Sequence, residues 1–451
     1  MIAVLLLTAF APLQAPSDGA PPEGLWLSAG IEAGTVGGDV VVGPTFGIGV
    51  ESRPFSAHLR LPVPLRVFDL PPPRDPALPA ACDVVRCEEL TEGGRLQLES
   101  LSRVLDDVRV FSPRDFLHLR AGRLLTTLGT GVLVDRHTTA SEWDRRKSGV
   151  YGELNLPLGG ARTEAYAGHV LAPQDLFALR QSFQPMAGVV VGGSVAGDAF
   201  APVSGSGVDR TGAVIPGAAT RPVVAAALDA EVVLVDAFGL RLMPTADVSV
   251  LSGLITTGSP APTVGAGAGI GAAALWDLRI LLLEARGLLR GSSAGHRSGL
   301  FSTLYDVERR RALVGGRPGE PLSAIPADGG FGGDARVGLS LLGAFHLLSR
   351  LHLEPAAGGN ALEVGARLSL GPFQGAFSAL RRGFVDGPGV LSADLDAVPL
   401  ICVAEGSLRF FGPFSFAARY VRLPRFDGQG GVRIDNDILV GVFADVVLRP
   451  G

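Results

Sequence analysis

The sequence lacks any run of residues suited to crossing a membrane as a helix. Its longest stretch without a charged residue extends from Val248 to Trp276, but Pro260 and Pro262 interrupt it and glycine and threonine crowd it. A membrane-spanning helix needs about 20 continuous, mainly apolar residues. The stretch is therefore better suited to two β-strands and a connecting loop.

Charged and aromatic residues are also scarce. They make up 18% and 6% of the 451 residues, whereas 47% are apolar and 62 are glycine, with a mean hydropathy of +0.34. High apolarity without helical spans is typical of a transmembrane β-barrel, in which only alternate residues face lipid. The net charge of −5 provides no basic footprint for nucleic acid, which we exclude as a partner.

Cysteine occurs only three times. Cys82 and Cys87, in CDVVRC, are close enough to form a disulfide that staples a small loop in an exported protein, whereas Cys402 stands alone on a predicted strand and is expected to face lipid. A zinc site at the first two cysteines is disfavoured because no further Cys or His lies near them. We predict no metal and no cofactor.

The N-terminal sequence MIAVLLLTAFAPLQA resembles a short secretory signal, with small residues near Ala11 and Ala15. It has no Lys or Arg before the apolar core, and a buried first helix is the alternative interpretation. We predict a signal peptide at residues 1–15, a polar segment at 16–24, and one domain at 25–451.

The repeating unit of that domain is a β-hairpin. In NALEVGARLSLGPFQGAFSALRRGF, Asn360 to Phe384, apolar and polar residues alternate on both sides of a turn at Gly371-Pro372-Phe373. A period of two is the strand period. Similar hairpins occur at Gly406 to Arg422 and at Ala225 to Val250.

Counting such units gives about 18 strands, within a range of roughly 16 to 20 that suits an even-numbered bacterial barrel. Short turns alternate with long polar segments such as Gly291 to Gly333 and Val385 to Asp396. We therefore predict an all-β fold: an antiparallel up-and-down transmembrane β-barrel with short periplasmic turns and long extracellular loops.

The first long loop is predicted to span Leu70 to Asp115. Leu98, Leu101, Leu105 and Val108 recur at helical spacing, which predicts a short amphipathic helix near residues 95–110. An apolar stripe of this kind is usually buried, so we expect the loop to fold toward the pore mouth and narrow it. Packing on the outer rim is the alternative.

Residues Phe116 to Gly149 read FLHLRAGRLL, TTLGTGVLVDRH and TTASEWDRRKSG. This run resembles the strand and tight-turn pattern of porin-type outer-membrane proteins of Gram-negative bacteria. The resemblance implies the bacterial outer membrane as the location and its lipid as a partner. It leaves the oligomeric state open.

The strongest functional pattern is the charge opposite the apolar faces of the strands. In a closed barrel these side chains would line an aqueous lumen. The predicted lumen-facing residues are Arg60, Arg120, Glu153, Asp229, Glu231, Asp247, Glu284, Arg286, Arg290, Arg350, Glu363, Arg367, Glu405, Arg409 and Arg419.

Two other patterns bear on possible cofactor binding or catalysis. The run GAGAGIGAA, Gly265 to Ala273, resembles a dinucleotide loop only superficially, because prolines precede it and hairpins flank it. Glycine in a twisted strand is the preferred interpretation. His346 and His352 share a strand face with Arg350 and Glu354, which favours a polar lumen over a hydrolase site because no catalytic motif accompanies them.

The function favoured by the sequence is a porin-like channel for small hydrophilic solutes, and we predict no enzymatic activity. A structural or adhesive surface barrel with a plugged lumen is the main alternative. An outer-membrane hydrolase and a soluble secreted β-protein are less favoured.

Overall fold

The structure is a computed structural model. It describes residues 24–36, 39–52, 55–62, 65–68, 91–92, 95–96, 105–112, 116–139, 148–156, 160–170, 173–204, 217–302, 305–309, 320–354, 359–384, 400–426 and 432–448.

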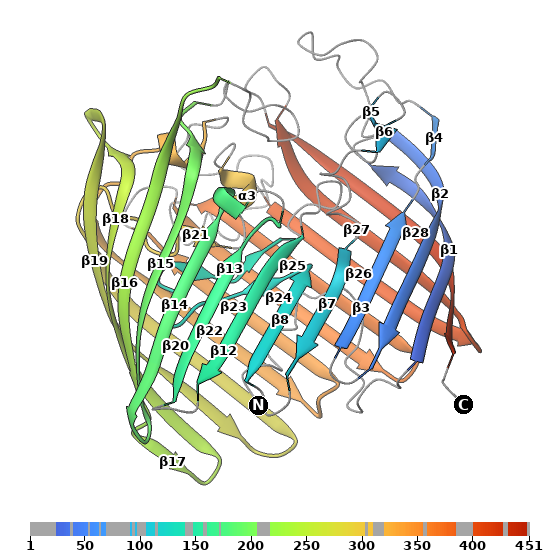
Figure 1. The fold of residues 1–451 in the computed structure, drawn as a ribbon, viewed down its shortest axis with the longest axis horizontal. Helices are drawn as coiled ribbons and strands as arrows, with labels where there is room; N and C mark the ends of the chain where they lie inside the picture. The colour runs from blue at the N-terminus through green and yellow to red at the C-terminus, as the bar shows by residue number, and fades with distance from the viewer. Residues whose placement is uncertain are drawn as a thin grey trace.

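One antiparallel sheet, called the wall below, encloses the interior of the molecule (Figure 1). In the first half of the chain its strands are β1 (Gly24–Val36), β2 (Asp39–Glu51), β3 (Phe55–Pro62), β4 (Leu65–Phe68), β7 (Leu105–Phe111), β8 (Leu117–Gly122), β12 (Gly149–Leu156), β13 (Ala161–Ala167), β14 (Phe177–Met186), β15 (Val189–Pro202), β16 (Thr220–Val232) and β17 (Val235–Ala237). In the second half they are β18 (Leu240–Thr256), β19 (Ser259–Asp277), β20 (Leu281–Ser292), β22 (Gly330–Leu341), β23 (Phe345–Leu353), β24 (Asn360–Leu370), β25 (Phe373–Phe384), β26 (Leu400–Phe411), β27 (Phe414–Phe426) and β28 (Val432–Leu448).

The sheet closes on itself. Each strand pairs with its neighbours in the sequence, and β1 pairs with β28 in a register that runs from Leu25 opposite Leu448 to Thr35 opposite Ile438. The sheet has 22 elements, but two of them continue a preceding strand. β4 continues β3, since both pair with β2, and β17 continues β16, since both pair with β18. The result is a closed up-and-down barrel of 20 strands without a free edge.

The strand number corrects the predicted value of about 18, although it falls within the predicted range. The two missed strands are β7 and β14. In β7, Asp107 and Arg109 alternate with Val108 and Val110, but Val108 also belongs to a series at helical spacing that predicts a helix instead. β14, with the sequence FALRQSFQPM, is not among the predicted strands.

The predicted helix near residues 95–110 is wrong where the structure describes it. Arg95–Leu96 is the short strand β6, paired with β5 (Thr91–Glu92), and Leu105–Phe111 forms part of the wall. Cross-strand hydrogen bonding to β3 and β8 here overrides the helical spacing. The predicted signal peptide and the Cys82–Cys87 disulfide lie outside the described residues.

The connections at one rim are tight turns. In the hairpin β24–β25, Leu370 pairs with Phe373 across Gly371 and Pro372, and Gly371 has φ of 55°. A positive φ followed by the fixed φ of proline suits a two-residue hairpin turn. At the β17–β18 turn both Phe238 and Gly239 have positive φ. These turns lie at the lower rim in Figure 1, opposite α3 (Tyr305–Glu308).

The burial pattern of the wall is inverted relative to a soluble protein. Leu228 on β16 is 62% exposed while its neighbour Asp229 is 4% exposed, and Leu289 on β20 is 72% exposed while Arg290 is 8% exposed. Because successive side chains of a strand point to opposite faces, the charged residues share the inner face and the apolar residues share the outer face. An outer apolar face belongs in lipid.

An arginine on that outer face should prevent stable insertion. Val364→Arg or Leu368→Arg on β24 is expected to destabilise the barrel by about 2–4 kcal/mol if the position lies near the bilayer midplane. Val364→Leu is the matched control and should leave folding unchanged. The readout is the fraction of protein that migrates differently before and after boiling on an SDS gel. Equal folding of the arginine and leucine variants would contradict a lipid-facing Val364.

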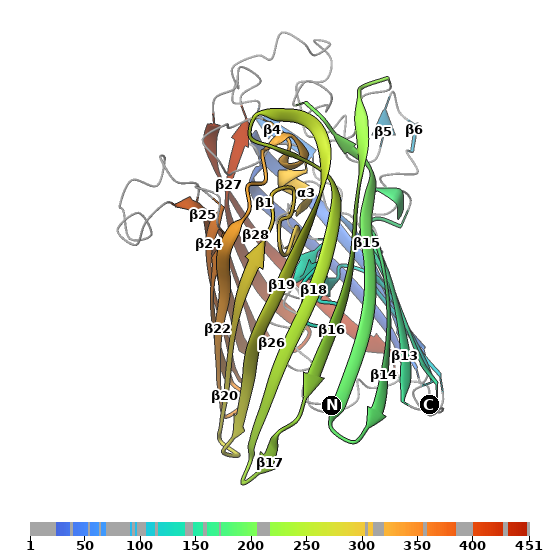
Figure 2. The ribbon, with the colours of Figure 1, turned by 90° about the vertical axis from the view of Figure 1, so that its left-hand side faces the viewer.

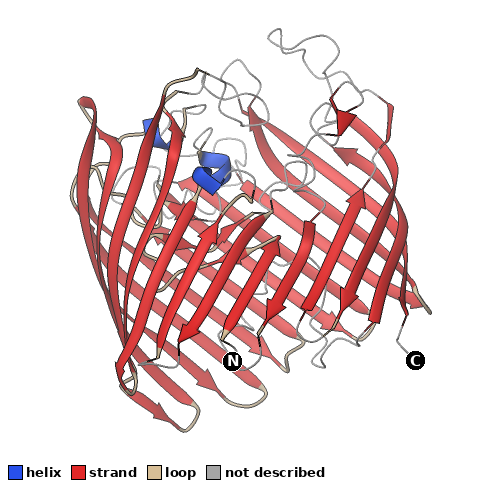
Figure 3. Ribbon diagram, in the orientation of Figure 1, coloured by secondary structure: helices blue, strands red, loops and turns tan. Residues whose placement is uncertain are grey.

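The remaining elements are short, and most lie inside the barrel or at its loop end (Figures 2 and 3). They are β9 (Leu125–Thr126), β10 (Val134–Asp135), β11 (His137–Thr138), β21 (Phe301–Ser302), the helix α3, and the single 3-10 turns η3 (Pro173–Asp175) and η5 (Leu322–Ala324). None of the helices in the described part of the chain has the length and apolarity needed to cross a bilayer.

Candidate functional site inside the barrel

Two segments leave the wall and fold against its inner face. The first inner segment is residues 123–139, between β8 and β12. The second inner segment comprises residues 293–302, 305–309 and 320–329, between β20 and β22. In both Figure 1 and Figure 2, α3 of the second inner segment lies within the outline of the barrel.

The two inner segments are joined to each other. β10 and β21 pair in parallel, with Val134 opposite Phe301. The Gly299 N–H donates to the Val132 carbonyl at 3.0 Å, and the Phe301 N–H donates to the Leu133 carbonyl at 3.3 Å. Because these are main-chain hydrogen bonds, the segments form one body inside the barrel.

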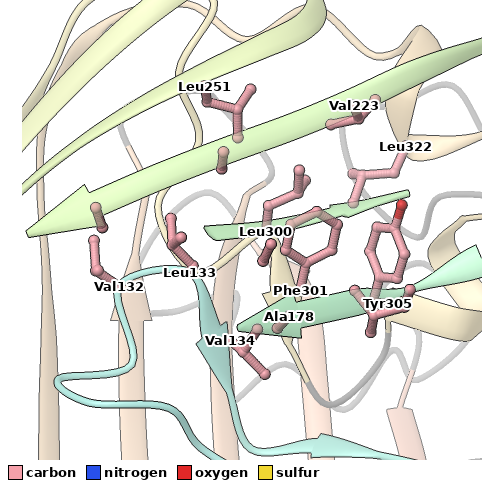
Figure 4. Packing of buried hydrophobic residues seen from close by; sticks show 14 of the residues in the cluster. Val132, Leu133, Val134, Ala178, Val223, Leu251, Leu300, Phe301, Tyr305 and Leu322 are labelled. Carbon is pink, nitrogen blue, oxygen red and sulfur yellow. The ribbon is translucent and has the colours of Figure 1, made fainter. Parts of the chain in front are cut away.

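An apolar core fixes this body to one side of the wall (Figure 4). Phe301 and Tyr305 pack edge to face with ring centroids 4.8 Å apart, and Leu322 is buried in the same cluster. The wall contributes small and aliphatic residues from β14 to β18, including Ala178, Ala196, Val223, Ala225 and Leu251. Burial of this surface excludes water between the inner segments and that part of the wall.

A buried ion pair strengthens the same side. The Arg309 guanidinium donates to Asp198 of β15 and lies 3.2 Å from Asp175 of η3, while the Tyr305 hydroxyl donates to Asp198 at 2.9 Å. Burial disfavours the charged form of Arg309, but the Asp198 carboxylate outweighs it and raises the pKa of Arg309. Arg309 therefore remains charged and anchors the second inner segment.

The first inner segment reaches a different part of the wall. Arg136 donates to Glu363 of β24 at 3.0 Å, and Asp135 forms an ion pair with Arg350 of β23, with a nitrogen–oxygen distance of 2.5 Å. The Thr130 carbonyl accepts from Arg286 of β20 at 2.5 Å. The segment thus crosses from its origin after β8 to strands β20–β24.

The second inner segment meets charges on the same strands. Arg297 lies 3.3 Å from Glu354, and Glu308 forms an ion pair with Arg382 of β25. Burial raises the pKa of the Glu308 carboxyl, while Arg382 and Arg297 act in the opposite direction. His352 lies between Asp334 and Glu354, at 3.4 and 3.5 Å. Both inner segments are therefore held to β22–β25 by ion pairs rather than by an apolar core.

The glycine run of β19 has a structural role at this site. A Cβ at Gly265 would lie 2.3 Å from the backbone nitrogen of His296, and a Cβ at Gly267 would lie 2.5 Å from the imidazole ring of His296. The His296 imidazole lies against these glycines and shares a 2.7 Å hydrogen bond with the Ser249 hydroxyl of β18. Glycine here makes room for the second inner segment to pack against β19. This packing explains the glycine run without a dinucleotide-binding loop.

Filling this space should displace the second inner segment. Gly267→Val is expected to break the Ser249–His296 contact and destabilise the protein by about 1–3 kcal/mol through overpacking. Gly287→Val on β20 is the matched control, since a Cβ there meets no atom within 4 Å. The readouts are the thermal unfolding midpoint and limited proteolysis of residues 293–329. Equal behaviour of the two variants would contradict the close packing of His296 on β19.

Open space remains on the ionic side of the body. A cavity that is partly open to solvent is lined by Arg290, His296, Arg297, His352 and Glu354. A second cavity, also partly open to solvent, is lined by Gly299, Arg350, His352, Glu363 and Arg382. His352 borders both, so the two cavities are neighbours along the β20–β25 wall.

The predicted lumen-facing residues divide by burial. The buried members are Asp229, Asp247, Arg290, Arg350 and Glu363. The half-buried members are Arg120, Glu153, Glu231, Glu284, Arg286, Arg367, Glu405 and Arg419, whereas Arg409 is exposed near the turn rim. Arg60 lies on β3, and its side chain is outside the described residues.

Most of these charges have partners that the alternation could not identify. Within the wall, Asp229 accepts from Arg180, Glu284 lies 3.1 Å from Arg336, and Glu405 lies 2.8 Å from Arg419. Across the lumen, Arg350 and Glu363 meet the first inner segment. The sequence analysis missed the wall residues Asp198 and Arg382 and the charged residues of the inner segments, which are Asp135, Arg136, His296, Arg297, Glu308 and Arg309.

The predicted constriction by residues 70–115 is wrong for the described part of that loop, because Leu105–Phe111 belongs to the wall. The segments that the structure places inside the barrel are instead the first and second inner segments. The reason is tertiary: their apolar residues find partners on the inner faces of β14–β18. The other residues of the predicted loop are outside the described residues, except β5 and β6.

The histidines do not assemble a hydrolase site in the described residues. His346 shares a 3.1 Å hydrogen bond with the Gly343 carbonyl at the turn rim, far along β23 from His352 in its carboxylate environment. Ser249 and His296 form a hydrogen-bonded pair, but within the described part of the chain no carboxylate is bonded to the second ring nitrogen of His296. A Ser–His–acid triad needs that third group.

The chain resembles porin-type outer-membrane barrels. A closed, antiparallel wall of 20 strands with an apolar outer face places it in the bacterial outer membrane. No protein-family model and no curated protein matches the sequence.

Three solved structures with similar folds come from Pseudomonas aeruginosa. OccK5 (OpdH) is 9% identical, and the match covers 95% of this chain and 98% of that chain with a TM-score of 0.39. OpdK with vanillate is 8% identical, and the match covers 94% of this chain and 98% of that chain with a TM-score of 0.37. A mutant ferric enterobactin receptor PfeA in complex with enterobactin is 10% identical, and the match covers 94% of this chain and 82% of that chain with a TM-score of 0.37. Similarity at these scores carries no functional argument, and the barrel follows from the strand register alone.

Proposed function

We propose that the protein is a narrowed outer-membrane channel for small hydrophilic solutes. Its charged inner-face residues line a water-filled lumen, and the two inner segments divide that lumen. The observation that carries the proposal is the pair of neighbouring polar cavities between the inner segments and β20–β25. Apolar packing against β14–β18 fills the other side.

The asymmetry of the inner segments supports an off-centre path. Against β14–β18 they are attached by buried apolar side chains such as Leu300 and Leu322, which leave no room for solute. Against β20–β25 they are attached by ion pairs such as Arg136–Glu363, between which polar space remains. Mixed charges along a wet path suit hydrophilic solutes and exclude apolar ones.

A plugged surface barrel is the second candidate. The inner segments form one body with its own buried core, and wide barrels are known whose lumen is filled by such a body. In that case the ion pairs on the β20–β25 side would close the remaining space. The wall and the inner segments would then serve only as a rigid platform.

Planar-bilayer recording of the purified full-length protein separates these candidates. The proposed channel should give discrete current steps in potassium chloride and should allow small neutral sugars to enter liposomes. Larger sugars should be excluded by the inner segments. Correctly folded protein that gives neither current steps nor sugar entry would overturn the channel and favour the plugged barrel.

A further inference from the structure

Three buried nitrogen donors line the first cavity without a hydrogen-bond partner among the described residues. They are Arg290 Nε, His296 Nδ1 and Arg297 Nη1. The side chains of Arg290 and Arg297 are only 7% and 4% exposed, so solvent does not reach them freely. Unpaired buried donors are costly and call for an acceptor in the cavity.

The histidine contributes as a donor because of its other contact. The Ser249 hydroxyl lies 2.7 Å from His296 Nε2, and when it donates to that nitrogen the ring proton is placed on Nδ1. Burial, aided by nearby Arg290, lowers the pKa of His296 to about 4. At neutral pH the imidazole is therefore uncharged, and in this tautomer it offers one N–H to the cavity.

The acidic residues that border the cavity are already occupied. Glu354 lies 3.3 Å from Arg297 Nε and 3.5 Å from His352 Nε2. Asp328 accepts from the Thr257 N–H at 3.1 Å and from the Thr257 hydroxyl at 2.7 Å. The two carboxylates that line the cavity are thus engaged, whereas three of its nitrogen donors are not; outside the lining, Asp247 of β18 lies 3.5 Å from Arg290 Nη2.

We propose that this cavity holds a small oxyanion, a carboxylate or a phosphate. Two guanidinium groups and one imidazole N–H line the same cavity, and such a set of donors suits an acceptor-only ligand with several oxygens. The inference rests on the proposed function and deepens it, since the cavity would be a binding site for anionic solutes on the β20–β25 side of the lumen. Neutral solutes would not be bound there.

The cavity is formed jointly by the wall and the second inner segment. Arg290 comes from β20, whereas His296 and Arg297 come from the second inner segment. A bound oxyanion would therefore bridge the two and stabilise the docked segment. Binding to the folded state alone raises the unfolding midpoint by mass action, whether or not the barrel conducts.

The test measures the thermal unfolding midpoint of the detergent-solubilised full-length protein at constant ionic strength with sodium acetate, inorganic phosphate or chloride. Acetate or phosphate should raise the midpoint in a saturable way, and chloride should not. The two oxyanion arms decide between a carboxylate and a phosphate. An equal response to all three salts would overturn the proposal.

Two variants locate the effect. Arg297→Lys keeps the charge beside Glu354 but removes the planar donor fork, and His296→Ala removes the imidazole donor; each should weaken oxyanion binding by roughly tenfold or more. Arg336→Lys is the matched control, because Arg336 pairs with Glu284 of the wall and does not line the cavity. Unchanged binding in both site variants would reject this location.

The same salts added to planar bilayers separate this proposal from the channel itself. Saturable stabilisation by acetate or phosphate in a protein without current steps would leave the site standing and reject the channel. Current steps in a protein without oxyanion binding would do the reverse.

Discussion

Replacing residues 296–326 with two glycines should raise the single-channel conductance several-fold. The Gly295 N–H donates to the Ala327 carbonyl at 2.7 Å, so the ends of the removed part are adjacent and the β20–β22 hairpin can close without stretching. The deletion removes Phe301, Tyr305 and Leu322 from the barrel interior and leaves the first inner segment without its partner. A barrel of 20 strands without this body is wide enough for an open aqueous channel.

A point substitution provides the matched control for the deletion. Phe301→Asp places a charge in the buried core of the inner segments, whereas Phe331→Asp changes a side chain that is 91% exposed near the same end of the barrel. Only Phe301→Asp should increase conductance, because only Phe301 holds the segments together. Unchanged conductance in the deletion variant, with intact heat-modifiable migration, would reject the inner segments as the constriction.

Arg309→Met should destabilise the docked second inner segment by about 3–5 kcal/mol, because it leaves the buried Asp198 carboxylate without its cation. Arg241→Met is the control. Arg241 forms an exposed pair with Asp236 at the turn rim, and such pairs contribute about 0–1 kcal/mol. The measurement is chemical denaturation in detergent, followed by proteolysis to report release of residues 293–329.

The double variant Asp198→Asn with Arg309→Met separates charge from packing. If an unpaired carboxylate causes the loss, neutralising Asp198 should recover a large part of the stability. Equal instability of the single and double variants would assign the effect to lost packing around Tyr305 instead.

The wall was predictable from the sequence because alternation is a local property. Val364 and Glu363 fall on opposite faces of any strand that contains them. In a closed barrel with an apolar outer face, Val364 therefore faces lipid and Glu363 faces the interior. The two missed strands show the limit of this reasoning. In β7 two periodicities coincide at Val108, and only hydrogen bonding to β3 and β8 decides between them.

The inner segments were not predictable because their contacts are distant in the sequence. Arg136 and Glu363 are 227 residues apart, and TTLGTGVLVDRH reads equally well as a strand and turn of the wall. One signal could have revealed them. Gly265, Gly267, Gly269 and Gly271 all fall on the inner face of β19, where an ordinary polar lumen would carry larger side chains.

The most direct test of the account is the position of lipid relative to the two faces of the wall. Single cysteines at Val248 on the outer face and at Ser302 on the second inner segment, in a background with Cys82, Cys87 and Cys402 all replaced by serine, can carry the same fluorescent probe. Spin-labelled lipid in the bilayer should quench the probe at 248 strongly and the probe at 302 weakly. Quenching of the 248 probe by aqueous iodide but not by spin-labelled lipid would contradict a barrel whose apolar face lies in the membrane.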